Sequence, residues 1–260
     1  MSSSETTTTG PTTPRRARRG RIFDLAERVP QGDPFEDTDE CRAYDRSVRT
    51  SMIIPMQHMM KLIGPDCGPE KDVLEIGCAS GLLSLRLAAQ HPDSVFTGLD
   101  TNDAFLEVAR ENTIFANLVS YGGDFSCDWA RYTRLPYEDD SFDVVFSFCA
   151  INRWDKPERI LPELARICRP GGNVLLYDLA RDADEGMVSF VLQYAGGDSN
   201  AFMRSLRASY SSDEMRALLD ELGLNHWSVS KEGINLVISS RDRDTGYSVG
   251  EPGIYDRIFD

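Results

Sequence analysis

The chain has 260 residues, 41% of them hydrophobic and 27% charged, and a formal net charge of −14. These values are typical of a globular protein that can bury a substantial core, as one large domain or one domain with a small attachment. The negative charge disfavours general binding to a nucleic-acid backbone, and no apolar run reaches the roughly 18 residues of a membrane span, so we expect no membrane partner.

The first 21 residues differ in composition from the rest. The run MSSSETTTTGPTTP has no apolar residue after Met1, and RRARRGR follows it. Such a segment buries too little apolar surface to offset its ordering entropy, so we predict that residues 1–21 form a disordered tail. Its five arginines and one acid leave a net charge of −18 on the remainder. The tail is either solvated or in contact with this acidic body or with a partner.

Residues 22–70 precede the first predicted strand and are mixed in polarity. The run SMIIPMQHMMKLI, at residues 51–63, places apolar side chains at helical spacing. We predict one or two helices here, which form an N-terminal helical cap.

Strand and helix patterns alternate from residue 72 onward. The predicted strands cover residues 72–76, 94–99, 118–121, 142–148 and 173–179, and the helices between them cover residues 82–90, 104–117 and 156–168. Five strands that alternate with helices indicate a parallel sheet with right-handed crossovers.

The last predicted elements are a helix at residues 212–222 and two strands, 226–230 and 234–239, which form a hairpin. We therefore predict an α/β fold with a doubly wound, mainly parallel seven-stranded sheet of Rossmann-like type and an antiparallel C-terminal hairpin. The connection at residues 180–211 is long and rich in aromatic residues and Met, which suggests a substrate lid or a helix on the sheet edge.

A turn of five small residues, Gly77-Cys78-Ala79-Ser80-Gly81, follows the first predicted strand. Ligands of doubly wound sheets bind at the carboxyl ends of strands, and missing side chains let a ligand approach the backbone. The turn lacks the G-x-G-x-x-G of a dinucleotide site and the Gly-Lys-Ser/Thr of a P-loop. Glu75, just before the turn, suits a ligand with a positive group.

Two further acids narrow the choice of ligand. Asp100 ends the second predicted strand, where a carboxylate can accept hydrogen bonds from both hydroxyls of a ribose. Asp124 follows the third predicted strand and could meet an adenine amino group, with Phe125 beside it. A ligand with an ammonium group, a ribose, an adenine and no phosphate fits, and S-adenosylmethionine has this composition.

From about Asp72 to Ser239 the chain resembles the class I S-adenosylmethionine-dependent methyltransferases of small molecules. The resemblance rests on an ordered set of motifs: VLEIGCASG, GLD, GGDF, LPYEDDSFDVVFSF and ELARICRPGGNVLLYDL. The first motif departs from the family where Ala79 replaces a glycine. The resemblance implies a cofactor-binding domain at residues 71–241 with the lid insert at 180–211, followed by a C-terminal tail at 242–260.

The resemblance also implies the cofactor, S-adenosyl-L-methionine, and the residues around it. Thr101 and Asn102 either contact its adenosine or cap the next helix, and Tyr44 could reach it from the N-terminal cap. The expected cofactor-binding residues are Tyr44, Glu75, Gly77, Cys78, Ala79, Gly81, Asp100, Thr101, Asn102, Gly123, Asp124, Phe125, Phe148 and Cys149.

We predict an enzyme that moves a methyl group from this cofactor to a small organic acceptor by in-line displacement, mainly through proximity and alignment. A hydroxyl acceptor also needs a base, for which His58, Asn152 and Asp178 are the catalytic candidates. We expect the acceptor pocket between the N-terminal helices, residues 152–154 and the insert. The expected substrate residues are Arg153, Trp154, Tyr194 and Tyr210.

The six cysteines include no Cys-x-x-Cys pair, so we expect no structural metal. Cys149 lies in FSFCAIN, which faintly resembles the strand-four end of arsenite methyltransferases, but no suitable second cysteine occurs at residues 190–210. A buried thiol is the preferred interpretation. No apolar signal segment follows the start, which favours free thiols in a reducing cytoplasm. The sequence leaves monomer and homodimer open.

Two other functions remain open at this stage. A protein of this fold could bind the cofactor and catalyse a different reaction, such as cyclisation, or it could serve as a scaffold. The presence of the three acids Glu75, Asp100 and Asp124 argues against an inactive site. A tRNA or protein substrate is disfavoured, because the Asn/Asp-Pro-Pro-Tyr/Phe signature and a broad basic surface are both missing.

Overall fold

The computed structural model describes residues 22–116, 124–127, 134–194 and 198–241, which hold most of the predicted elements. The predicted tails at 1–21 and 242–260, the predicted strand at 118–121 and Gly123 lie outside the described residues. None of the helices in the described ranges combines the length and the apolar composition of a membrane span.

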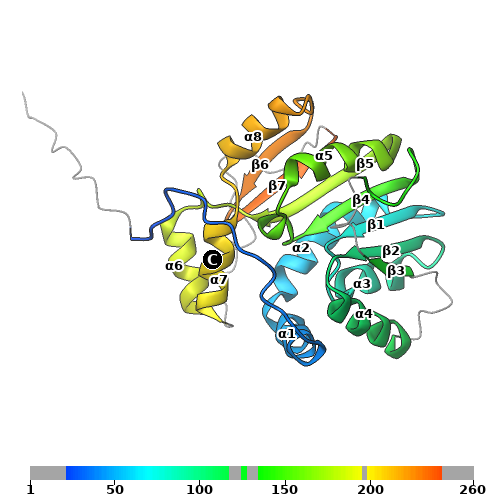
Figure 1. Cartoon of the computed structure of the whole chain (residues 1–260), viewed down its shortest axis with the longest axis horizontal. Coiled ribbons are helices and arrows are strands. Elements are labelled where there is room, and N and C mark those ends of the chain that lie inside the picture. The colour runs from blue at the N-terminus through cyan, green and yellow to red at the C-terminus, as the bar shows by residue number, and fades with distance from the viewer. Residues whose placement is uncertain (1–21, 117–123, 128–133, 195–197, 242–260) are drawn as a thin grey trace, which may run out of the picture.

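A seven-stranded sheet forms the centre of the described structure, in the order β3-β2-β1-β4-β5-β7-β6 (Figure 1). Five strands run parallel, and β7 pairs in the antiparallel sense with β5 and β6. The strands are β1 (Asp72–Ile76), β2 (Val95–Asp100), β3 (Asp124–Cys127), β4 (Phe142–Phe148), β5 (Cys168–Leu179), β6 (Ser228–Glu232) and β7 (Asn235–Ser239). The doubly wound α/β fold predicted from the sequence is confirmed, and its strand order reverses between β1 and β4.

Two apolar clusters hold the helices on the two faces of the sheet. On one face Val73, Phe146 and Tyr177 pack against α2 (Ile53–Ile63), α3 (Leu82–Gln90) and α4 (Asp103–Phe115). On the other face Leu74 and Val145 pack against α5 (Pro157–Ile167) and α8 (Ser212–Glu221). The central strands are therefore apolar over nearly their whole length, because helices cover both sides.

Several boundaries differ from the predicted ones. The N-terminal cap has two helices, α1 (Thr38–Ser51) and α2, and Pro55 lies in the first turn of α2, where the missing N–H is not needed. β5 begins at Cys168, directly after α5, and its register with β4 shifts between Phe142 and Val144. β6 begins two residues later than predicted, so His226 lies in the turn before the strand.

Residues 180–211 contain two helices, α6 (Glu185–Tyr194) and α7 (Ser199–Ala208). Residues 22–37, here called the N-terminal strap, cross from these helices to the start of α1 (Figure 1). The buried guanidinium of Arg181 donates to two strap carbonyl groups, and the N–H of Val29 donates to a carbonyl of α7. At the other end, the Asn102 amide donates to Asp33 at 2.7 Å. The strap therefore ties the insert helices to the start of α4.

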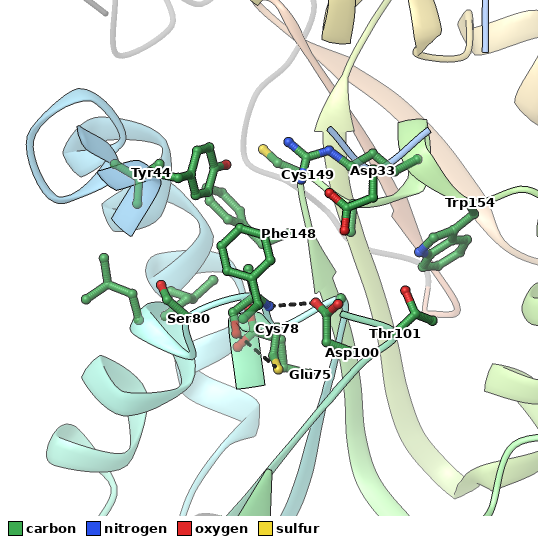
Figure 2. Close-up of a pocket in the computed structure, with 18 of the residues that line it drawn as sticks. Asp33, Tyr44, Glu75, Cys78, Ser80, Asp100, Thr101, Phe148, Cys149 and Trp154 are labelled. Atoms are coloured by element: carbon green, nitrogen blue, oxygen red, sulfur yellow. Dashed lines mark hydrogen bonds between the residues drawn. The ribbon is translucent and has the colours of Figure 1, made fainter. Parts of the chain in front are cut away.

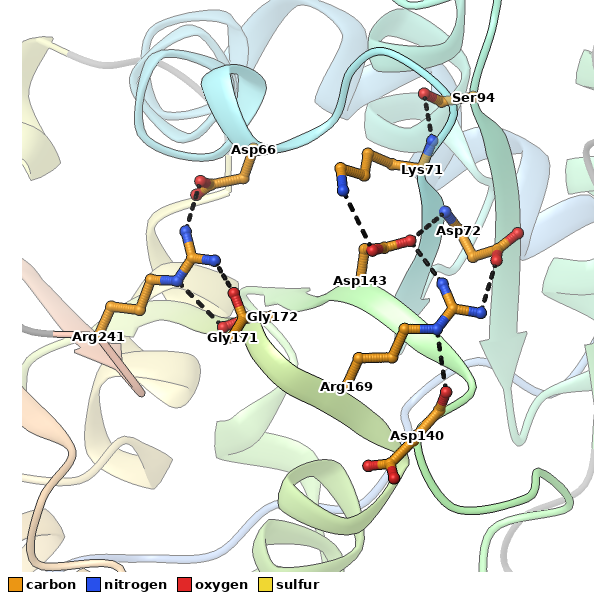
Figure 3. A network of polar contacts seen from close by, with 10 residues as sticks. All are labelled: Asp66, Lys71, Asp72, Ser94, Asp140, Asp143, Arg169, Gly171, Gly172 and Arg241. Atoms are coloured by element: carbon orange, nitrogen blue, oxygen red, sulfur yellow. Dashed lines mark hydrogen bonds and ion pairs between the residues drawn. The ribbon is translucent and has the colours of Figure 1, made fainter.

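A network of ion pairs joins the amino ends of β1, β4 and β5 (Figure 3). Asp143 accepts hydrogen bonds from the Asp72 N–H at 3.0 Å and from Lys71 at 3.2 Å, and Arg169 contacts both aspartates. Partial burial raises the pKa of Asp143, but these hydrogen bonds and the two cations lower it more. The network stabilises the sheet at the edge opposite the carboxyl ends of the strands.

Candidate active site

A cavity of about 340 Å³ opens at the carboxyl ends of β1, β2 and β4, next to the switch point of the sheet (Figure 2). Cavities at this position are the usual ligand sites of doubly wound folds. Eleven of the sequence-predicted residues line it: Tyr44, Glu75, Gly77, Cys78, Ala79, Asp100, Thr101, Phe148, Cys149, Arg153 and Trp154.

The turn at residues 77–81 forms one wall of the cavity, and its backbone requires small residues. Gly77 has a φ of 74°, and a Cβ atom there would lie 2.5 Å from the Cβ of Ala150. Ala79 also has a positive φ, 46°, which is uncommon for a residue with a side chain. Gly81 has a φ of 71°, precedes α3 as its N-cap, and does not line the cavity. The small residues therefore expose turn backbone to a ligand.

Asp100, the last residue of β2, is fixed beside this turn (Figure 2). Its carboxylate accepts hydrogen bonds from the Ala79 N–H at 2.8 Å and from the Asn102 N–H at 3.0 Å. Burial raises its pKa, and the backbone hydrogen bonds oppose that rise. A carboxylate can accept more bonds than these two, so Asp100 has acceptor capacity left for a ligand in the cavity.

Glu75 lies on the floor of the cavity and is 3% exposed. One of its oxygens accepts hydrogen bonds from the N–H and the hydroxyl of Ser84, at 3.2 and 2.5 Å. Burial raises the pKa of Glu75 to about 8, although the bonds from Ser84 lower it. A cation bound nearby would favour the ionised form.

Asn102 is a helix cap rather than a cavity residue. Its side-chain oxygen accepts hydrogen bonds from the N–H groups of Ala104 and Phe105, at 2.9 and 3.3 Å, and its amide holds the strap. The sequence allowed either a contact with adenosine or a helix cap for Asn102, and the structure shows the helix cap. Thr101, next to it, does line the cavity.

The placement of Asp124 after the third strand is wrong. β3 pairs with β2 so that Asp124 lies level with Thr97 and Cys127 lies level with Asp100. Asp124 therefore begins the strand, three residues before its carboxyl end, and Phe125 lies in the middle of it. Because the strand was predicted at residues 118–121, its carboxyl end was expected before Asp124.

The three predicted catalytic residues do not line the cavity. His58 lies 3.0 Å from a carboxylate oxygen of Glu232 and 3.3 Å from the hydroxyl of Tyr177, between α2 and the sheet. Asn152 donates its N–H and its amide to Asp178, at 3.0 and 2.7 Å, and both are at most 3% exposed. Asp178 and Asn152 thus satisfy each other, and burial raises the pKa of Asp178.

Of the predicted substrate residues, Arg153 and Trp154 line the cavity, while Tyr194 and Tyr210 do not. Tyr194 is 65% exposed at the end of α6, and Tyr210 packs under the guanidinium of Arg28. No described residue of the insert lines the cavity, because the strap lies between. The strap supplies Asp33 to the lining, α1 supplies Val48, α2 supplies Met56, and Met52 lies between the two helices. The sequence had suggested none of these four residues.

Cys78 and Cys149 line the cavity as free thiols. Burial raises the pKa of both well above the ordinary thiol value, with a further contribution from neighbouring carboxylates. In the described residues no group of three His, Cys, Asp or Glu side chains is placed to hold a metal ion. Both thiols are therefore poorly suited to act as thiolate ligands.

A sequence model of the methyltransferase domain family matches residues 74–176, which include the turn, Asp100 and β4. Residues 74–176 therefore carry a methyltransferase domain of the class I, S-adenosylmethionine-dependent type. S-adenosylmethionine is the cofactor of this family, and the site fits it, since a close-approach turn, the acceptor Asp100 and the carboxyl group of Glu75 surround one cavity.

The curated relatives of this chain act on different acceptors. An arsenite methyltransferase of Halobacterium salinarum is 28% identical over 182 residues, which are 68% of this chain and 43% of that protein. A fatty-acid O-methyltransferase of Mycolicibacterium smegmatis is 30% identical over 156 residues, 60% of this chain and 51% of that protein. The chain thus spans about half the length of these relatives or less.

Solved structures agree on the fold. A methyltransferase from Aquifex aeolicus superposes with a TM-score of 0.56 and 16% identity, over 79% of this chain and 98% of the other. The plantazolicin methyltransferase BpumL, solved with S-adenosylhomocysteine, has a TM-score of 0.58 and 13% identity, over 81% of this chain and 91% of the other.

Proposed function

We propose that this methyltransferase transfers the methyl group of S-adenosylmethionine to a small organic acceptor that binds in the same cavity. The observation that carries the proposal is the hydrogen bond between the Ala79 N–H and the Asp100 carboxylate, which fixes the bare turn and an acid on one wall. The cavity volume lies in the range of small-molecule sites.

The assignment of roles follows the geometry of the lining. Asp100 accepts the ribose hydroxyls, the backbone at residues 77–80 lies against the methionine part of the cofactor, and Glu75 faces its ammonium group. Tyr44, Phe148 and Cys149 surround the sulfonium.

When bound, the cofactor supplies an electrophilic methyl group, and the chain contributes alignment and exclusion of water. Residues from α1, α2, α3 and the junction between α1 and α2 give the cavity an apolar side that excludes water from the reacting atoms. They are Val48, Met52, Met56, Leu82 and Leu83. The strap closes another side through Asp33, so the insert helices support the strap instead of covering the acceptor themselves.

The relatives act on different acceptors, among them arsenite and a fatty acid. A fatty acid has an apolar body, which suits the apolar side of the cavity. We disfavour arsenite for this chain, because only two thiols, Cys78 and Cys149, are among the described residues that line the cavity. Residues 71–241 then form the cofactor-binding domain, with residues 22–70 as its cap.

Calorimetry with S-adenosylhomocysteine tests the proposal. Binding in the micromolar range, on the order of −8 kcal/mol, is expected for the cofactor product. Incubation with isotopically labelled cofactor and a cell extract should then transfer label to a compound of low molecular mass. Undetectable binding at millimolar ligand contradicts the proposal, and label confined to macromolecules contradicts the small acceptor.

A further inference from the structure

We propose that the acceptor is a carboxylate with an apolar body, that Arg153 binds it, and that methyl transfer forms a methyl ester. This inference rests on the proposed function and names its substrate class. Three observations support it: a cation at the cavity that forms no ion pair with a described residue, a lining without a histidine, and an apolar side.

The guanidinium of Arg153 is held at the cavity by aromatic rings. Its central carbon lies 5.4 Å from the ring centre of Phe35 and 5.8 Å from that of Tyr44. Its Nε is buried without a hydrogen-bond partner, and no ion pair joins Arg153 to a carboxylate of the described residues. A prepositioned guanidinium of this kind matches a carboxylate in two hydrogen bonds.

Charged side chains of both signs line the cavity. Lys156 and Arg159, near the start of α5, lie in the lining with Arg153 and are exposed. The acids of the lining are Asp33, Glu75, Asp100 and Asp155. Because acids and cations both line the cavity, the guanidinium of Arg153, which forms no ion pair with the residues that the structure describes, is the group that would bind an anion.

The histidines of the chain do not supply a base to this cavity. All three are described, and none lines it. His58 contacts Glu232, His91 packs beside Gly68, and His226 lies in the turn before β6. An acceptor hydroxyl would therefore lack the usual group that removes its proton.

The other titratable groups around the sulfonium position are also poor bases. Burial raises the pKa of Tyr44 and of Cys149, so both are protonated at neutral pH. Asp100 and Glu75 are engaged by the Ala79 N–H and by Ser84. A carboxylic acid has an ordinary pKa of about 4, so it enters the site already ionised and needs no base.

The apolar side of the cavity suits the rest of such an acceptor. Val48, Leu82 and Leu83 give it shape, while Met52 and Met56 can adjust to a chain or a ring. The carboxylate then lies at Arg153 and the apolar body lies along α1 and α2.

The reaction balances without any other reactant. One carboxylate oxygen attacks the sulfonium methyl carbon, the new carbon–oxygen bond forms as the carbon–sulfur bond breaks, and the sulfur keeps the electron pair. The products are a neutral methyl ester and S-adenosylhomocysteine, and no proton is transferred.

The test uses the full chain with S-adenosylhomocysteine bound. Octanoate, dodecanoate and benzoate are titrated by calorimetry beside their amides, for wild type, Arg153→Gln and the control Arg204→Gln, which changes an exposed arginine of α7. We expect at least one acid to bind ten times more tightly than its amide. That preference should be lost in Arg153→Gln, while the affinity for S-adenosylhomocysteine stays within twofold. Label transferred to that acid should be released as methanol by mild alkali.

Three results overturn the inference. The first is that no acid in the panel binds better than its amide, and the second is that the transferred label resists alkali. The third is that Arg153→Gln weakens S-adenosylhomocysteine binding tenfold, which assigns Arg153 to the carboxylate of the cofactor. In each case the proposed methyl transfer still stands, since only a wild-type protein that fails to bind S-adenosylhomocysteine removes that function.

Discussion

Replacement of Asp100 is the most direct perturbation of the proposed cofactor site. The carboxylate already accepts two backbone hydrogen bonds, at 2.8 and 3.0 Å, so Asp100→Ala would also leave the N–H groups of Ala79 and Asn102 without an acceptor. Asp100→Asn keeps the shape and one oxygen and removes the charge. It is therefore the better variant for measuring what the carboxylate contributes to a ligand.

The expected loss follows from the two ribose hydroxyls. A hydrogen bond to a charged acceptor contributes about 1.5–3 kcal/mol, so loss of two such bonds weakens S-adenosylhomocysteine binding by on the order of 100-fold, and partial compensation by the amide still leaves at least tenfold. Asp93→Asn, in the exposed turn before β2, removes the same charge far from the cavity and should not change the affinity.

The test is calorimetry of wild type, Asp100→Asn and Asp93→Asn with S-adenosylhomocysteine, together with their circular dichroism spectra. The reasoning predicts a native spectrum for Asp100→Asn with the weakened binding. An affinity within twofold of wild type would falsify the ribose assignment and leave Asp100 as the residue that fixes the turn.

The remaining predictions concern Glu75 and the N-terminal segment. Because Glu75 has a pKa raised to about 8, it destabilises the fold as the pH rises from about 4.5 to 8, and a bound ammonium should ionise it. Cofactor binding near pH 7 should therefore release a proton, seen by calorimetry in buffers of different ionisation enthalpy, and Glu75→Gln should abolish the release. Deletion of residues 1–20 should leave the melting temperature within about two degrees, whereas deletion of residues 1–36 should lower it by more than about five degrees, since Arg181 loses two strap carbonyls. Equal melting temperatures would refute a stabilising strap.

The turn and Asp100 could be predicted from the sequence because their signals are local. An apolar strand, five small residues and a helix follow one another within 20 residues, and an acid ends the next strand. The fold then brings these pieces together, because parallel strands share one carboxyl edge. The turn and Asp100 could therefore be predicted without knowledge of contacts between residues far apart in the sequence.

The third strand shows where local signals fail. Residues 118–121 and Asp124–Cys127 have similar strand character, and an edge strand of four residues gives little periodicity to choose between them. In the structure, Asp124–Cys127 pair with β2, so the carboxyl end of the strand lies at Cys127. The strap was missed for a related reason, since its bonds to Arg181 span more than 150 residues and mostly involve backbone carbonyls.

The three residues predicted as bases do not line the cavity, and the reason is physical. In a sequence, polar side chains at strand ends are natural candidates for catalytic residues. A buried polar group, however, needs a hydrogen-bond partner. Here Asn152 and Asp178, 26 residues apart in the sequence, form hydrogen bonds with each other. His58 is likewise engaged, by Glu232 and Tyr177. A cavity without a histidine, beside three predicted bases that are engaged in the fold, is compatible with methyl transfer when the acceptor arrives ionised. The same burial that makes these residues structural therefore favours an acidic acceptor over an alcohol.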